Sequence, residues 1–391
     1  MRRFIVGLAG LVILLVLAWV GLWFYAEIRL KQLVEAKVEQ INNSGSGQVT
    51  YSRLAASSSP LVAGVTMLDP QFLVTFSGAP SPITVSAARI GAHIDLLHPL
   101  TLHIDVPLKI MLGGHDGAAV LTFASATITE TLTPSVWQGD TSNPIVAGDA
   151  DYTGINLLAS NGSLQVAQID RLALHQTLNA EAGTSQPALV LTEDMQNLRV
   201  SPVLTRLFAL PFNGEISRLS GSLSMSGPLN WEQIAKQQAK LHDEAQRTKF
   251  LLQTFHQWAQ SGGHALGQFT LRVGPTHMQT NFTLAFDQQV QPEGKTDVNA
   301  DHLGEFTNAL VTAYPDLQTS ISQIQETLSP YLSTTPASGQ ALNLHVTYGQ
   351  NGVFVNGKKT GAPPHLDWND LLNPPPPTTF APGDGSGAAL Q

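Results

Sequence analysis

The chain has no cysteine and few charged residues, and each absence removes classes of function. Without cysteine there are no disulfides, no thiolate nucleophile and no cysteine-bound zinc. Charged residues make up 13% of the 391 residues, where a typical domain has about 25%. The largest basic clusters are the pairs Arg2-Arg3 and Lys358-Lys359, and the net charge is −9. We therefore expect no nucleic-acid partner, because phosphate binding needs clustered cations.

The common catalytic motifs are also missing. The sequence contains no phosphate-binding loop, no dinucleotide-binding glycine pattern, no His-Glu-x-x-His helix and no Gly-x-Ser-x-Gly elbow. We assign no catalytic, cofactor-binding or metal-binding residue and no cofactor, and we expect that the protein is not an enzyme.

The strongest candidate for a metal site is a set of histidines and aspartates. His93, His98 and His103 are spaced by five residues, with Asp95 and Asp105 beside them. Such a set has the ligand types of a divalent metal site. A proline interrupts the run, however, and polar residues at alternating positions are typical of any solvated sheet face. The second interpretation is favoured.

Paired carboxylates are the remaining catalytic possibility. Asp149 and Asp151 fall on one face of a predicted strand, whereas Glu130, Asp170 and Asp287 stand alone in the sequence. Glycoside hydrolysis uses two carboxylates that folding brings together. A hydrolase of envelope polymers is therefore an alternative function, with no residue to name for it.

The N-terminus predicts a transmembrane anchor, residues 1–25. Phe4 to Tyr25 are 22 uncharged, mostly apolar residues, enough for a helix of about 20 residues to span the hydrocarbon core. Arg2 and Arg3 precede the run, so the positive-inside rule predicts a cytoplasmic N-terminus and an exported remainder. A cleaved signal peptide is the alternative, but the run is too long and is followed by bulky residues.

Residues 26–47 predict a juxtamembrane helix and linker. The aromatic residues just before it, Trp19 and Trp23 among them, predict an interfacial belt. Leu30, Val34, Val38 and Ile41 form one stripe along the helix. We expect this stripe to pack on the protein's own following domain, with pairing to a second copy as the alternative.

Residues 48–226 predict a β-rich part. Thr101 to Val106 alternates polar and apolar residues, and similar runs recur between turn signals such as Asn161-Gly162 and Asn213-Gly214. Strands with one wet and one buried face are typical of an antiparallel sheet. The predicted fold class is therefore mainly β (α+β), a long antiparallel sheet or groove-like β structure with a few covering helices.

Residues 227–362 predict an α/β C-terminal part, and residues 363–391 a disordered Pro/Gly-rich tail. The C-terminal part has a long helix over 231–260 capped by Asn230, two shorter helices over 301–332, and strands between and after them. Trp368 and Leu371-Leu372 in the tail suggest either a docking motif for a partner or a solvated terminus.

Several short motifs in the C-terminal half resemble a known family. They are Trp258–Gly263 (WAQSGG), Phe269–Pro275 (FTLRVGP), Leu284–Asp287 (LAFD), Gln291–Gly294 (QPEG) and Asn356–Pro364 (NGKKTGAPP). Their order, with an apolar anchor, a short helix and a strand at Gln48–Leu54, resembles the bacterial domain of unknown function 2125. One departure is Ser58–Leu61, where that family tends to have Gly-Phe-Pro. We interpret Gly262, Gly263, Gly274 and Gly294 as scaffolding and expect Trp258 to join helix to sheet.

The resemblance implies a membrane-anchored envelope protein of Gram-negative bacteria with no assigned reaction. A looser similarity to AsmA-type envelope proteins implies lipid handling. We therefore expect a single-pass inner-membrane protein with the bulk of the chain in the periplasm. The expected function is binding of an apolar or lipid ligand in a β groove. The alternative is a non-catalytic interaction or assembly scaffold with an envelope protein partner.

Overall fold

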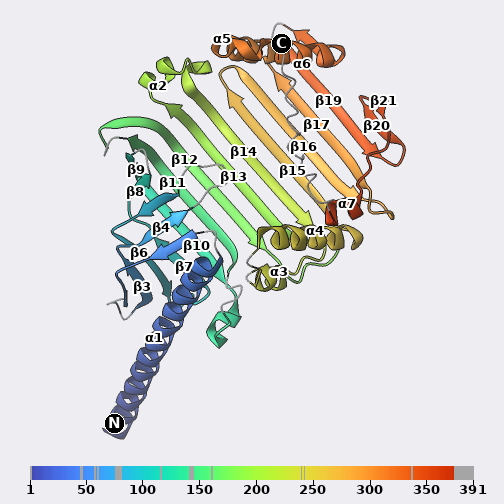
Figure 1. Ribbon diagram of the computed structural model, residues 1–391. Helices are drawn as coiled ribbons and strands as arrows, with labels where there is room; N and C mark the ends of the chain where they lie inside the picture. Colours follow the sequence, from blue (N-terminus) through green and yellow to red (C-terminus); the bar gives the residue numbers. More distant parts are fainter. Residues whose placement is uncertain are drawn as a thin grey trace, which may run out of the picture.

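The protein is one broad antiparallel sheet with helices at the ends of its strands (Figure 1). The computed structural model describes residues 2–44, 47–56, 59, 61–74, 82–114, 117–140, 145–159, 162–238, 240–241, 243–335 and 338–373. Within this part of the chain the mainly β fold and the long antiparallel sheet are confirmed.

The central sheet consists of long neighbouring strands, each antiparallel to the next. In spatial order they are β11 (Ile145–Ala159), β12 (Leu164–Leu178), β13 (Pro187–Val200), β14 (Glu215–Ser226), β15 (His264–Val273), β16 (Thr276–Phe286), β17 (Pro292–Asp301) and β19 (Gly339–Gly349). Because β14 pairs with β15, the predicted boundary between residues 226 and 227 does not interrupt the sheet.

Short strands from the N-terminal half form two branches that pair with the same edge of β11. The branches diverge at Gly154, whose φ is +56°. The first branch contains β10 (Ser125–Leu132), β7 (Thr101–Asp105), β6 (Arg89–Asp95), β3 (Val62–Leu68) and β2 (Arg53–Ala56). The second contains β9 (Gly117–Thr122), β8 (Lys109–Gly114), β5 (Ile83–Ser86), β4 (Gln71–Val74) and β1 (Gly47–Thr50).

The outer edge of β19 carries two short strands with a gap between them. β18 (Leu332–Thr335) and β20 (Gly352–Val355) pair with its two ends, and β21 (Lys358–Gly361) pairs with β20. Asn356 fills the gap: its side-chain oxygen accepts from the His345 amide at 2.7 Å, and its side-chain nitrogen donates to the Asn343 carbonyl at 3.0 Å. The backbone hydrogen bonds of β19 are thereby satisfied between its two short neighbours.

The helices lie at the ends of the strands, not across the whole sheet (Figure 1). They are α1 (Arg2–Ser44), α2 (Pro202–Leu207), α3 (Trp231–Gln238), α4 (Glu244–Gln260), α5 (Leu303–Ala313), α6 (Gln318–Leu328) and α7 (Trp368–Leu372). The helix predicted over 231–260 is two helices, because Asp243 accepts a hydrogen bond from the Ala245 amide and begins α4 as its N-cap. Asn230 caps α3 as predicted, accepting from the Gln233 amide.

Helix α1 packs on the protein's own N-terminal lobe. Ala26, Leu30 and Leu33 are buried against β3, β6 and β7. Of the predicted stripe, Leu30 packs on the following domain as expected, Val34 and Val38 are half-buried, and Ile41 is exposed. Of the aromatic residues predicted to form an interfacial belt, Trp19 and Trp23 pack against this same core, and the Trp23 indole donates to the Val62 carbonyl. Phe24 and Tyr25 are exposed.

The structure leaves the predicted membrane span unassigned. Within the described residues no helix is both long and apolar enough to cross a membrane. The side chains of residues 4–16, which form most of the predicted span, lie outside the described part of the chain.

A second core joins α4 to the sheet. Trp258 is 1% exposed, its indole donates to the Ser226 carbonyl at 2.9 Å, and its ring packs edge-on to Phe286. Gly263 permits this packing, since a Cβ there would lie 2.3 Å from the Trp258 ring. The scaffolding interpretation of Trp258 and of the adjacent glycines is confirmed.

The predicted disordered tail begins with a packed segment. Trp368 in α7 stacks on His256 of α4, and its indole donates to the Val290 carbonyl at 2.8 Å. The Leu366 amide donates to the Gln291 side chain, which donates back to the Leu366 carbonyl. The partner of Trp368 is thus this chain itself, and the rest of the predicted tail, residues 374–391, lies outside the described residues.

Candidate functional site

The two faces of the central sheet differ sharply in chemistry. Residues that pair across antiparallel strands share a face, and successive residues alternate between faces. One row across the sheet is polar throughout: Asp149, His175, Thr192, Ser222, Gln268, Asn281, Asp297 and His345. We call this side the polar face and the other the apolar face.

Charged residues on the polar face are paired with one another. Arg171 forms a bidentate contact with Asp151, the closest distance being 2.6 Å, and lowers the pKa of that carboxyl. His175 contacts Asp149 at 2.7 Å. Asp149 and Asp151 share a face as predicted, but each is bound to a cationic or imidazole partner on β12. They therefore form a ladder of cross-strand pairs and not a pair of carboxylates facing one cleft.

The candidate metal ligands come together only in part. The rings of His93 and His103 stack with centroids 5.1 Å apart, and His93 contacts Asp105 at 2.9 Å. His98 contacts Asp95 separately, at 3.5 Å. Among the described residues, no group of three or more histidine and carboxylate side chains has the geometry to hold a metal ion.

The apolar face is one continuous surface from the N-terminal lobe to β19. A single row of cross-strand partners runs Val65, Ala92, Ile104, Ile128, Ala150, Leu174, Glu193, Gly221, Phe269, Thr280, Val298 and Leu344. Its first members belong to the core under α1. Its last two belong to a third core, packed with α5 and the residues after α6. The α4 core covers the same face at the other ends of the strands, through Leu223 and Leu284.

Between these three cores the described part of the chain leaves the apolar face uncovered. We call this region the open strip, defined by Ala150, Leu174, Leu191, Phe269 and Phe282. Leu174, Leu191 and Phe269 are 41%, 39% and 42% exposed, although they are large and apolar. A groove of ≈ 640 Å³ lies over them, within the range of about 300–1,000 Å³ typical of ligand sites.

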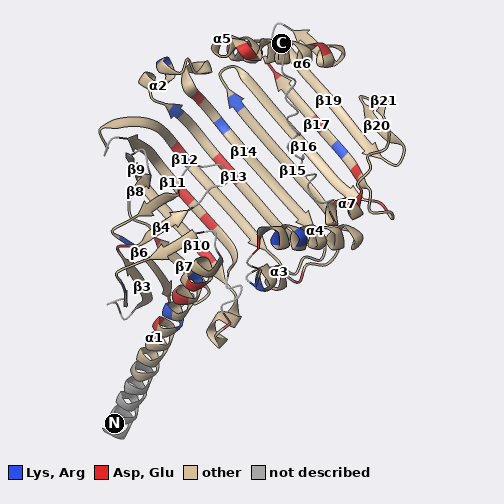
Figure 2. Ribbon diagram, in the orientation of Figure 1, with Lys and Arg blue, Asp and Glu red and all other residues tan. Residues whose placement is uncertain are grey.

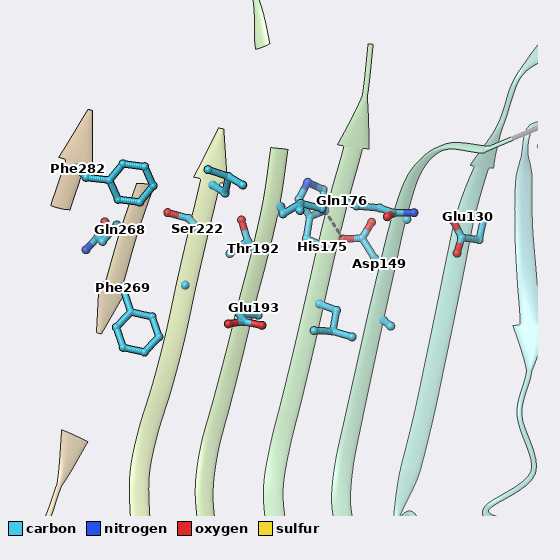
Figure 3. A pocket seen from close by; sticks show the side chains of 16 residues that line it. Glu130, Asp149, His175, Gln176, Thr192, Glu193, Ser222, Gln268, Phe269 and Phe282 are labelled. Carbon is cyan, nitrogen blue, oxygen red and sulfur yellow. Dashed lines mark hydrogen bonds and ion pairs between the residues drawn. The ribbon is translucent and has the colours of Figure 1, made fainter. Parts of the chain in front are cut away.

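Gly148, Ala150 and Gly221 lie among the larger residues that line this groove, and its two ends differ in chemistry. Gly267 lies under the Phe282 ring, since a Cβ there would be 2.1 Å from it. Figure 3 shows the lining strands side by side, with Phe269 and Phe282 at one end and Glu130 at the other.

Glu130 is the unusual residue of the groove. It pairs with Gly148 on β11 and Leu102 on β7, and its carboxyl lies over Gly148, where a Cβ would be 2.4 Å from Oε2. That oxygen is enclosed and has no hydrogen-bond partner in the described part of the chain. Burial and, secondarily, the charge of Asp149 raise the pKa of Glu130. The side chain as a whole is half-buried, so a ligand in the groove can reach it.

Sequence reasoning placed Glu130 among carboxylates without a role. Its signal was present in the pattern: within Ser125–Leu132 it occupies the position between Ile128 and Leu132, where alternation predicts an apolar residue. A charged residue on the buried face of a strand is expensive without a partner. That departure from the alternation marks Glu130, whereas the open strip itself depends on where the helices pack.

Comparison with known proteins identifies a family and nothing finer. No curated protein matches the chain. The similarity to AsmA-type proteins therefore stays a prediction. A family model described as "uncharacterized protein conserved in bacteria (DUF2125)" matches residues 23–358, which include α1 from Trp23, the whole central sheet and helices α2 to α6. The chain therefore belongs to this DUF2125 family of bacterial proteins, as its C-terminal motifs predicted.

Proposed function

We propose that the protein holds the hydrocarbon part of an amphiphilic ligand on the open strip and is not an enzyme. The observation that carries the proposal is the exposure of Leu174, Leu191 and Phe269 on a face that is otherwise covered by three cores. Exposed apolar surface of this kind, next to polar surroundings, is typical of a binding site. Each buried methylene contributes about 0.8 kcal/mol, so a single alkyl chain is enough for useful affinity.

The proposal includes a membrane location. The apolar run Phe4 to Tyr25 after Arg2-Arg3 supports an inner-membrane anchor with the sheet in the periplasm. Since α1 continues from that run into the core of the N-terminal lobe, the sheet would stand directly on the bilayer, the source of amphiphiles.

The two alternatives find less support. A scaffold that docks a partner through Trp368 would have to release that residue from α4 and Val290. A hydrolase would have to use carboxylates such as Asp149 and Asp151, which are engaged with His175 and Arg171.

The test is photo-crosslinking of the full chain in detergent micelles with a diazirine-bearing fatty acid, followed by peptide mapping. Cross-links should map to β11–β16. The variant Leu174→Gln should reduce them severalfold. Leu266→Gln is the matched control, because Leu266 is also exposed, at 49%, but lies on the polar face. Cross-links that are absent, or that respond equally to the two variants, would refute the proposal.

A further inference from the structure

The charges on the apolar face are few, and those that line the groove on this face are acidic. Along the paired rows from β10 to β19, the charged residues facing this side in the described part of the chain are Glu130, Asp170, Glu193, Arg199 and Glu215. Asp170 and Arg199 pair with each other at 2.8 Å. Of the five, Glu130 and Glu193 line the groove. The other arginines of these strands, Arg171, Arg218 and Arg272, fall in the rows of the polar face. Figure 2 shows acidic residues on strands β10 to β13, the end of the sheet nearest α1.

Both carboxylates lie in the groove, and they lie over glycines. Glu130 covers Gly148, and Glu193 covers Gly221, where a Cβ would be 3.2 Å from its carboxyl oxygen. Glu193 is exposed, whereas the Oε2 atom of Glu130 is enclosed and has no donor in the described part of the chain. An enclosed acceptor without a donor is a cost of roughly 1–3 kcal/mol that a bound donor would remove.

The groove is therefore acidic toward one end and aromatic at the other. Glu130 lies on β10, Glu193 on β13, and the aromatic pair Phe269 and Phe282 on β15 and β16. With strands about 4.8 Å apart, six spacings from β10 to β16 give roughly 29 Å. The acidic end suits a polar head and the aromatic end suits a hydrocarbon tail.

We infer that the amphiphile held in the open strip carries a protonated amine, which binds the Glu130 carboxylate while its alkyl chain extends toward Phe269 and Phe282. An ammonium group offers three N–H donors and forms charge-assisted hydrogen bonds about twice as strong as neutral ones. An anionic head would meet Glu130 and Glu193 with no lysine or arginine among the described residues that line the groove to offset them. A hydroxyl head would satisfy Oε2 but would leave the acidic charges uncompensated. This inference rests on the proposed function and specifies its ligand.

The test is competition against the photo-crosslinking probe, with the full chain in micelles and competitors of equal chain length. Dodecylamine, dodecanol and dodecanoate are titrated against the wild type, Glu130→Gln and Glu215→Gln. The quantity compared is the ratio of amine to alcohol potency, in which partitioning into micelles cancels between variants. Glu215 is the control because it is an exposed glutamate at the start of β14, outside the groove.

The amine should compete about tenfold better, relative to the alcohol, in the wild type and in Glu215→Gln, as expected for one charge-assisted hydrogen bond. The ratio should fall toward one in Glu130→Gln, and dodecanoate should be the weakest competitor. Equal ratios in all three proteins, or dodecanoate as the best competitor, would overturn the inference while leaving the apolar site intact. A chain that cross-links to no probe would instead remove the proposed function and this inference with it.

Discussion

The core under α4 and the open strip are two regions of one sheet face, built from the same alternation of residues. Leu223 and Leu191 are paired neighbours on adjacent strands. Leu223 packs into the α4 core, whereas Leu191 is 39% exposed. The difference between them is the presence of a helix, not the character of the residue. Burial on this face is therefore decided by which segments pack on it, and the strip is surface that no helix in the described part of the chain covers.

The largest expected effect separates the two regions directly. Trp258→Ala should lower the free energy of unfolding by about 3–5 kcal/mol, because it leaves a cavity between α4 and the sheet. Phe269→Ala in the open strip should cost about 1 kcal/mol or less, since the ring is 42% exposed. Urea unfolding of the full chain in micelles, followed by far-UV circular dichroism, measures both. Equal losses would mean that the strip is as well packed as the core.

Trp368 tests how far the α4 core extends into the C-terminal segment. Trp368→Ala should cost about 1–2 kcal/mol, because the side chain is half-buried and loses one hydrogen bond and an aromatic stack. Hydrogen exchange of residues 366–373 should accelerate. Leu371→Ala, at a position 39% exposed, is the control and should leave exchange unchanged. Unaltered exchange in the tryptophan variant would show that the segment is held by other contacts.

Glu130→Gln should stabilise the protein slightly, and only above acidic pH. Burial raises the pKa of Glu130 in the folded state. The contribution of this side chain to the free energy of unfolding is therefore fully present below the ordinary glutamate pKa and is lost as pH rises through the raised pKa. Near about pH 8 the free energy of unfolding of the variant should therefore exceed that of the wild type by less than about 1 kcal/mol, because the carboxyl is only half-buried. The difference in free energy of unfolding between the two proteins should disappear near about pH 4.

Thermal melts across this pH range measure the difference, with Glu215→Gln as the control. A difference in stability of the same size at every pH would show that ionisation of Glu130 does not cause it.

The smallest effect is expected at the centre of the open strip. Leu174→Ser should change the free energy of unfolding by within about 0.5 kcal/mol, because the side chain is 41% exposed. The matched change Leu223→Ser should cost at least about 2 kcal/mol, as removal of a packed side chain under α4 does. A large loss at Leu174 would indicate that the groove is filled by the protein itself.

The sequence predicted the strands better than it predicted the helices and how they pack. Alternation within Glu215–Ser226 and an Asn-Gly turn before β20 are local signals, and both elements formed. The break between α3 and α4 was missed because Asp243 reads as one more polar residue on a helix until its side chain caps the Ala245 amide. The docking of Trp368 on α4 joins residues more than a hundred positions apart in the chain, which no local pattern encodes.

The candidate site could be predicted only in part for the same reason, because local patterns do not encode contacts between distant residues. The apolar residues of the open strip are visible as alternation in each strand, but their alignment into one row requires the register of several strand pairs. Glu130 is visible as an exception to alternation on β10. Its meaning depends on the glycine opposite and on the lack of a donor in the described part of the chain, which only the paired strands reveal.

Asn356 affects whether a second copy of the chain can pair with the edge of β19. An unpaired strand edge is a template on which another chain can add a strand, the route to edge-to-edge polymers. The amide of Asn356 occupies the donor and acceptor of β19 that β18 and β20 leave between them. Growth by strand addition is therefore blocked along that stretch of β19, so the sheet gains no width there from further copies.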